Sequence, residues 1–138
     1  MRSRRLIIVV LSALSLSGCL VSNTLADRPL DAGATRIYAA DFEQVAAALD
    51  AAMETLPVNL SDPVMLGPNR VTEFSRPTGA YNWGEIGRVV VTPLSGARTR
   101  VVVTVENRYR LQPTHGSEAD FATMIFTRTQ RGLPRRPS

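Results

Sequence analysis

The sequence predicts an α+β domain in which two helices cover one face of an antiparallel sheet of four to five strands, in the order β-α-β-β-β-β-α. Three observations predict this fold. Apolar residues recur at helical spacing in two segments, residues 41–56 and 117–132. Two β-branched runs flank a Ser95-Gly96-Ala97 turn, as in an antiparallel hairpin. The second run alternates apolar and polar residues, which is typical of a strand with one buried and one solvated face.

The first two elements are a short strand and a helix. TRIYAA, residues 35–40, contains the strand formers Ile37 and Tyr38. DFEQVAAALDAAMETL, residues 41–56, follows it, with Asp41 as N-cap, Gln44 at the capping-box position and Pro57 after the last turn. The residues predicted to face the core are Phe42, Val45, Leu49, Ala52, Met53 and Leu56.

The middle of the chain, residues 58–83, is divided by prolines and glycines into pieces too short for helices. Two short strands are expected, near residues 64–66 and 70–74, with the GPN sequence between them as a turn. The loop TGAYNWG holds Tyr81 and Trp83, which could form a binding platform or cap the sheet edge. The role of this segment stays open.

The predicted hairpin joins EIGRVVVTPL, residues 85–94, to RTRVVVTVENRYRL, residues 98–111. One face of the second strand is expected to be core, and it carries Val101, Val103, Val105, Tyr109 and Leu111. The other face is expected to be solvated, and it carries Arg100, Val102, Thr104, Glu106, Arg108 and Arg110. A sheet with one solvated face places both helices on the opposite face.

The last predicted element is the helix SEADFATMIFTRTQRG, residues 117–132. Ser117 is its expected N-cap, acidic residues occupy its first turn, and Gly132 is expected at the C′ position. Its expected buried stripe consists of Phe121, Met124, Ile125 and Phe126. Residues 134–138 form a basic, proline-containing tail that is expected to be disordered.

The first 18 residues have the pattern of a secretory signal peptide. MRSRR is positively charged, and LIIVVLSALSLSG is apolar. The uncharged stretch covers the 16 residues 6–21. A helix of that length reaches roughly 24 Å, which is less than the hydrocarbon core of about 30 Å. Cleavage is therefore favoured over a permanent membrane span.

The leader ends in Leu16-Ser17-Gly18-Cys19, which resembles the lipobox of bacterial lipoproteins. The resemblance implies cleavage after Gly18, a thioether between Cys19 and diacylglycerol, and palmitate-type acylation of the new amine. Two or more acyl chains hold a protein firmly on a membrane. Leu20, in place of the Asp that often retains lipoproteins on the inner membrane, implies the outer membrane facing the periplasm, with the inner membrane as the alternative.

This reading divides the chain into a signal peptide (1–18), a lipidated N-terminus with a flexible tether (19–34), one α+β domain (35–133) and the tail (134–138). The order of elements is similar to that of several small α+β domains, and architecture alone does not give a function.

Composition gives little support to nucleic-acid binding or to catalysis. The net charge is +4, but three of the 16 arginines lie in the leader; without them 13 arginines face 12 acidic residues. One histidine, His115, and one cysteine leave no material for a catalytic triad or a His/Cys metal site, so no cofactor is expected. Glu85 and Glu106 are expected on neighbouring strands. Two carboxylates on neighbouring strands could act as a catalytic pair, so a carboxylate-dependent envelope hydrolase stays open as the alternative function. Cross-strand ion pairs are the simpler role for these two side chains.

Charge is distributed unevenly along the predicted mature chain. Residues 19–75 hold three arginines and eight acidic residues, whereas residues 76–138 hold ten arginines and four acidic residues. We hypothesise that four arginines form a positive strip on the solvated sheet face and bind an anionic partner: Arg98, Arg100, Arg108 and Arg110. Ordinary solvation is the alternative. The predicted function is a non-enzymatic binding or assembly accessory of the cell envelope, with an envelope protein as partner and no nucleic acid.

Overall fold

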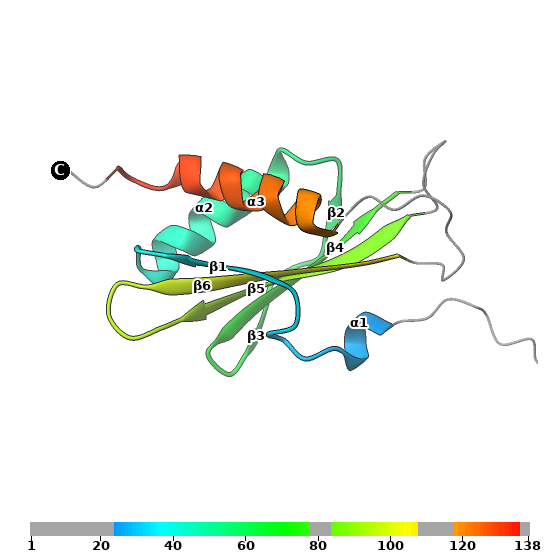
Figure 1. Ribbon diagram of the computed structural model, residues 1–138, viewed down its shortest axis with the longest axis horizontal. Helices are drawn as coiled ribbons and strands as arrows, with labels where there is room; N and C mark the ends of the chain where they lie inside the picture. The colour runs from blue at the N-terminus through cyan, green and yellow to red at the C-terminus, as the bar shows by residue number, and fades with distance from the viewer. Residues whose placement is uncertain (1–23, 78–83, 108–117, 136–138) are drawn as a thin grey trace, which may run out of the picture.

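The computed structural model describes residues 24–77, 84–107 and 118–135, which form one antiparallel sheet and three helices (Figure 1). In chain order the elements are α1 (Thr24–Asp27), β1 (Ala34–Tyr38), α2 (Phe42–Glu54), β2 (Asn59–Leu60), β3 (Val64–Leu66), β4 (Asn69–Arg76), β5 (Glu85–Pro93), β6 (Thr99–Asn107) and α3 (Glu118–Gly132). The predicted α+β class is confirmed. The sheet has six strands rather than four or five, and α1 was not predicted.

The strands follow the order β1-β6-β5-β4-β2, and β3 also pairs with β4. All pairs are antiparallel. β1 therefore lies at one edge of the sheet, while β2 and β3 lie along the opposite edge. The additional strand is β2, which pairs over only two residues, Asn59 with Ser75 and Leu60 with Phe74. A strand so short has no alternation that a sequence pattern could reveal.

Local signals in the sequence correctly placed the α2 N-terminus and two turns. Asp41 caps α2, because its side chain accepts a hydrogen bond from the Gln44 N–H at 2.9 Å. The β3–β4 turn has Gly67 at φ +62°, and the β5–β6 turn has Gly96 at φ +71°. Glycine adopts this left-handed conformation at no steric cost. Both predicted hairpins are confirmed.

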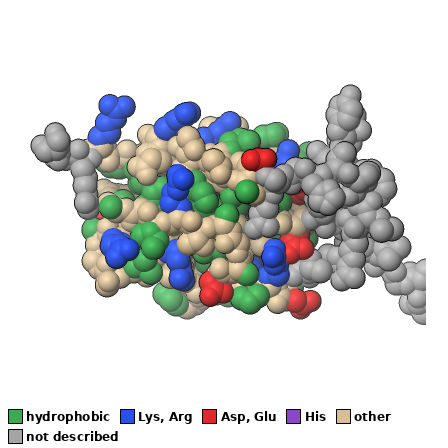
Figure 2. All heavy atoms as spheres, viewed as in Figure 1, with side chains coloured by type: hydrophobic (Ala, Val, Ile, Leu, Met, Phe, Trp, Pro, Cys, Tyr) green, Lys and Arg blue, Asp and Glu red, His purple; other side chains and the backbone are tan. Residues whose placement is uncertain are grey.

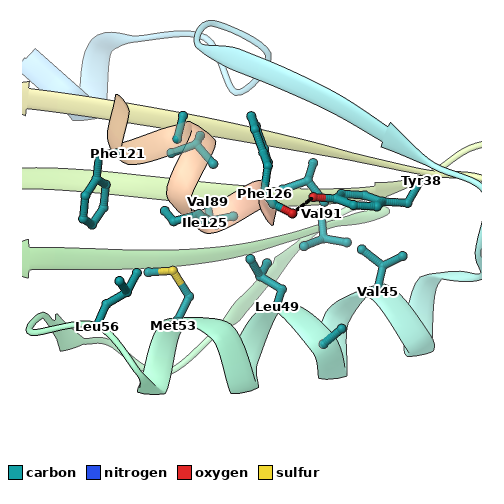
Figure 3. Close-up of a cluster of buried hydrophobic side chains, with 14 of the residues drawn as sticks. Tyr38, Val45, Leu49, Met53, Leu56, Val89, Val91, Phe121, Ile125 and Phe126 are labelled. Atoms are coloured by element: carbon teal, nitrogen blue, oxygen red, sulfur yellow. Dashed lines mark hydrogen bonds between the residues drawn. The ribbon is translucent and has the colours of Figure 1, made fainter. Parts of the chain in front are cut away.

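The main core lies between the sheet and the pair α2 and α3, which cover the same sheet face (Figures 1 and 3). From β5 and β6 it receives Val89, Val91, Val101 and Val103, all at most 1% exposed. From the helices it receives Val45, Leu49, Met53, Phe121, Ile125 and Phe126. The Tyr38 hydroxyl donates to the Phe126 carbonyl at 3.0 Å, which ties β1 to α3.

Two details of α3 differ from the prediction. Met124 is 40% exposed, because the buried stripe follows Phe121, Ala122, Ile125, Phe126 and Thr129 instead. Gly132 is the last helical residue and does not have a positive φ, so it is not a C′ glycine. A Cβ on Gly132 would lie 3.3 Å from the Ala48 Cβ, so the missing side chain lets α3 approach α2 closely.

The second face of the sheet is covered by residues 24–33, which we call the strap (Figure 1). Leu25 is 3% exposed, and Leu30 packs against Val71, Val90 and Val102, which are 7%, 1% and 1% exposed. The prediction of a solvated second face is therefore wrong, and so is the prediction that residues 24–33 belong to a flexible tether. The strap folds back because each central strand carries apolar residues on both faces, and both faces need cover.

Candidate interaction surfaces

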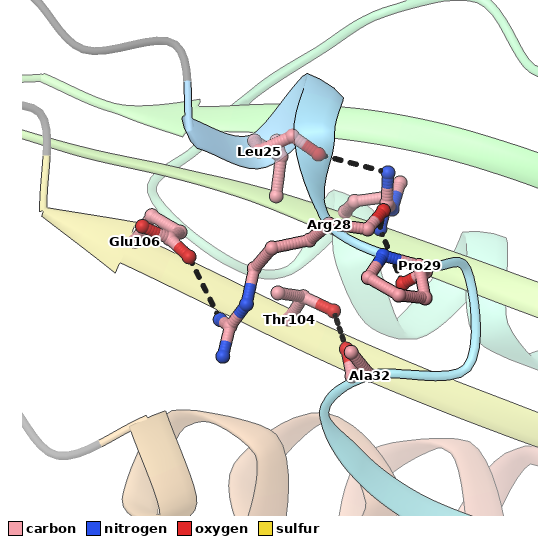
Figure 4. Close-up of polar contacts among 7 residues, drawn as sticks. Leu25, Arg28, Pro29, Ala32, Thr104 and Glu106 are labelled. Carbon is pink, nitrogen blue, oxygen red and sulfur yellow. Dashed lines mark hydrogen bonds and ion pairs between the residues drawn. The ribbon is translucent and has the colours of Figure 1, made fainter.

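Arg88 of β5 fastens the strap to the sheet through backbone carbonyls of residues that Figure 4 labels, among them Leu25 and Pro29. Its guanidinium donates to three backbone carbonyls, those of Leu25 at 3.0 Å and of Arg28 and Pro29 at 2.9 Å each. The Leu25 oxygen lies in α1 and the other two lie just after it; those of Leu25 and Pro29 also accept from the N–H groups of Arg28 at 3.4 Å and Ala32 at 3.1 Å. Arg88 is 4% exposed, and its Nε has no hydrogen-bond partner among the described residues. We call Arg88 and these three carbonyls the clamp.

Further contacts hold the strap along β6. Arg28 forms an ion pair with Glu106 at 2.8 Å, and the Thr104 hydroxyl donates to the Ala32 carbonyl (Figure 4). Gly33, at φ +148°, lies directly on the backbone of Val103. The strap is therefore held to the sheet at several points between Leu25 and Gly33.

Two of the four arginines of the predicted strip, Arg98 and Arg100, lie among the described residues. Arg98 lies in the exposed β5–β6 turn. Arg100 is only partly exposed, and it lines a hollow of about 180 Å³ beside Leu30 and Asp31 of the strap. Arg108 and Arg110 lie outside the described residues. Figure 2 shows the arginine side chains of the described residues spread over the visible face.

Glu85 and Glu106 are brought to opposite faces of the sheet. Glu85 of β5 pairs with Asn107 of β6, and Glu106 of β6 pairs with Ile86 of β5. Because successive side chains of a strand point to opposite faces, the two carboxylates lie on opposite faces of the sheet. Glu85 is 2% exposed and forms an ion pair with Arg76 at 2.6 Å. Because Glu85 and Glu106 lie on opposite faces of the sheet, they cannot flank one substrate bond as a catalytic pair. Within the described ranges no group of three or more His, Cys, Asp or Glu residues is placed to hold a metal ion.

The edge formed by β2 and β3 carries exposed apolar side chains that we call the apolar edge. Its members are Leu60, Val64, Met65 and Leu66, which are 40%, 56%, 56% and 49% exposed. The three residues of β3 are consecutive, so their side chains leave the strand on both faces. Among the described residues only Ile37 and Met124 are other large hydrophobic residues with comparable exposure.

A cleft of about 310 Å³ joins the apolar edge to the start of the strap. Leu25 of the strap and Leu60 of β2 both line it, and Phe74, Ile86 and Gly87 of the sheet contribute to its wall. The Phe74 ring lies over Gly87, which has no side chain to obstruct it. The start of the strap therefore lies beside Leu60, at the β2 end of the apolar edge.

The opposite edge of the sheet is β1, which pairs with β6 alone among the described strands. Thr35, Arg36 and Ile37 are exposed, and Ile37 is 47% exposed. The Arg36 guanidinium lies 5.1 Å from the centre of the Phe126 ring, a cation–π contact that holds it over α3. We call this strand, with its outer backbone groups and Ile37, the β1 edge.

Sequence reasoning missed both the clamp and the apolar edge. For the strap, the available signal was two runs of three consecutive valines, residues 89–91 and 101–103, which indicate strands buried on both faces. For the apolar edge, it was VML between Pro63 and Gly67, three apolar residues in a segment too short to bury them all. Cys19 and His115 lie outside the described residues.

Comparison with known proteins gives no assignment. No helix in the described part of the chain has both the length and the apolar character needed to cross a membrane. No protein-family model matches the chain, and no curated protein is similar to it.

Proposed function

We propose that the chain is a bacterial lipoprotein, cleaved after Gly18 and lipidated on Cys19, that faces the periplasm from the outer membrane. Support comes from the basic and apolar leader and from the four-residue motif that ends it. The described fold begins at Thr24, five residues after Cys19, so the proposed anchor lies directly before the folded domain.

Its proposed role is that of a non-enzymatic binding or assembly accessory of the cell envelope, and the observation that carries this role is the β1 edge. The outer N–H and C=O groups of an edge strand are a template for a strand from another chain, which adds by main-chain hydrogen bonds. The exposed Ile37 supplies an apolar side chain for such a strand to recognise. The partner we expect is an envelope protein with an extended segment.

The anchor is tested by the intact mass of the native product. A chain that begins at Cys19 and carries diacylglycerol and an acyl group supports the proposal. A chain with an unmodified thiol or with the leader attached would refute it.

The β1 contact is tested by photo-crosslinking in intact cells from a probe at Thr35, which is exposed beside Ile37. We expect one envelope protein to be captured, and Ile37→Asp to abolish the adduct. The matched control is Ala47→Asp on the exposed side of α2, which should leave the adduct unchanged. An adduct that survives Ile37→Asp would argue against strand addition at this edge.

A further inference from the structure

The strap shortens the connection between the proposed lipid anchor and the folded domain. Residues 19–34 were expected to form a tether, but the clamp holds the carbonyls of Leu25, Arg28 and Pro29 against the sheet. Only residues 20–23 then separate Cys19 from α1. Five Cα-to-Cα steps span at most about 18 Å. The start of the strap therefore stays close to the bilayer.

The β2 end of the apolar edge lies beside the start of the strap. Leu25 and Leu60 line one cleft, so the strap begins beside β2. In Figure 1, α1 and β3 lie on the side of the sheet away from α2 and α3. A short connection from Thr24 to a bilayer thus brings β3, which carries three of the four residues of the apolar edge, toward the lipid rather than the helical layer.

The side chains of the apolar edge suit a lipid surface. Val64, Met65 and Leu66 project on both faces of β3, and each is about half exposed. A protein partner that lies on one face of a strand leaves the alternate side chains in water, whereas the apolar boundary of a bilayer surrounds both. The acidic Asp62 between Leu60 and Val64 gives no reason to require anionic lipid.

We propose that the apolar edge rests in the surface of the membrane that holds Cys19, with the β1 edge directed away from it. This inference depends on the lipid anchor of the proposed function. It assigns Leu60, Val64, Met65 and Leu66 to lipid contact. Because β1 lies at the other edge of the sheet, the same orientation leaves β1 accessible to a periplasmic partner.

The test uses the full mature protein, purified from its membrane and reconstituted into phosphatidylcholine vesicles with or without brominated acyl chains. Met65→Cys provides a labelling site on the apolar edge, and Ala47→Cys on α2 provides the matched control. Because a Cys19 thioether does not react, each variant has one free thiol for an environment-sensitive fluorophore. We expect brominated chains to lower the fluorescence at position 65 about twofold and to leave position 47 unchanged.

The possible failures are distinguishable. Intact mass comes first, and an unmodified Cys19 would overturn the anchor and the membrane contact together. A lipidated protein with equal, weak quenching at both positions would overturn the membrane contact alone. A label at position 65 that stays unquenched on vesicles, and is protected only when envelope protein is added, would assign the apolar edge to a protein and overturn the proposal.

Discussion

Replacing Arg88 by methionine is the most direct perturbation of the strap. Methionine keeps much of the apolar length of the arginine side chain but removes the guanidinium that donates to the carbonyls of Leu25, Arg28 and Pro29. The valines beneath the strap and the α2–α3 core are not altered. The substitution therefore separates the contribution of the clamp from that of the main core.

The expected loss follows from two opposing terms. A hydrogen bond from a charged donor contributes about 1.5 to 3 kcal/mol, so three contribute about 4 to 9 kcal/mol. Against this, a buried guanidinium costs several kcal/mol in lost hydration, and the unpartnered Nε of Arg88 adds to that cost. The net expectation is that Arg88→Met lowers the free energy of unfolding by about 2 to 3 kcal/mol.

The assay combines urea unfolding with amide hydrogen exchange. The amides of Arg28 and Ala32 donate within the strap, to the carbonyls of Leu25 and Pro29, and such short turns protect amides only while they remain docked. We expect both amides to exchange faster in Arg88→Met, while the α2 amides change less. The control is Arg98→Met, since Arg98 is exposed and its loss should change stability by less than about 0.5 kcal/mol.

One result would refute this reasoning. If Arg88→Met matches Arg98→Met in stability, and the strap amides keep their protection, the strap is held by Leu25 and Leu30 packing and the clamp adds nothing.

Three further predictions concern the packing of the sheet. Gly87→Ala should cost about 1 to 3 kcal/mol in urea unfolding, because the new Cβ would lie 2.6 Å from two carbons of the Phe74 ring; wild-type stability would contradict this. Burial raises the pKa of Tyr38 from its ordinary value of 10.0 to about 12, so its contribution to stability should be constant below pH 10 and fall by roughly 2 kcal/mol as the pH rises to 12. Tyr38→Phe should remove that fall, and a persistent fall would assign it to another group. Gly33→Ala should destabilise the docked strap by about 2 kcal/mol or more, because φ is +148° and the new Cβ would lie 2.8 Å from the Thr104 hydroxyl oxygen. Faster hydrogen exchange of the strap amides would show this loss.

Local features of the sequence were sufficient for most of the individual elements. Asp41 capped α2 as expected, because an N-cap depends on residues only three positions apart. The glycine turns placed both hairpins, because a left-handed residue between two β-branched runs leaves few alternatives. The lipobox prediction also depends on adjacent residues alone, and it stays a prediction because Cys19 lies outside the described residues.

The surfaces could not be predicted in the same way. Alternation in β6 identified Val101 and Val103 as core residues correctly, but it assigned Val102 and Thr104 to solvent, and both are at most 1% exposed. Alternation reports which residues share a face and does not report what covers that face. The predicted arginine strip stays a prediction, because Arg108 and Arg110 lie outside the described residues, while Arg100 lies beside the strap.

The sequence by itself determined the α+β class, the helix cap and the two hairpins, because each is specified by neighbouring residues or by a short period. Only the tertiary structure decided that residues 24–33 lie on the second sheet face and that Leu60 and β3 remain exposed at its edge. The strap contains a proline, a glycine and several polar residues, and it docks because Arg88, some 60 positions away, donates to its carbonyls. Every residue type has a backbone carbonyl, so the side chains of the strap do not indicate that its carbonyls bind Arg88.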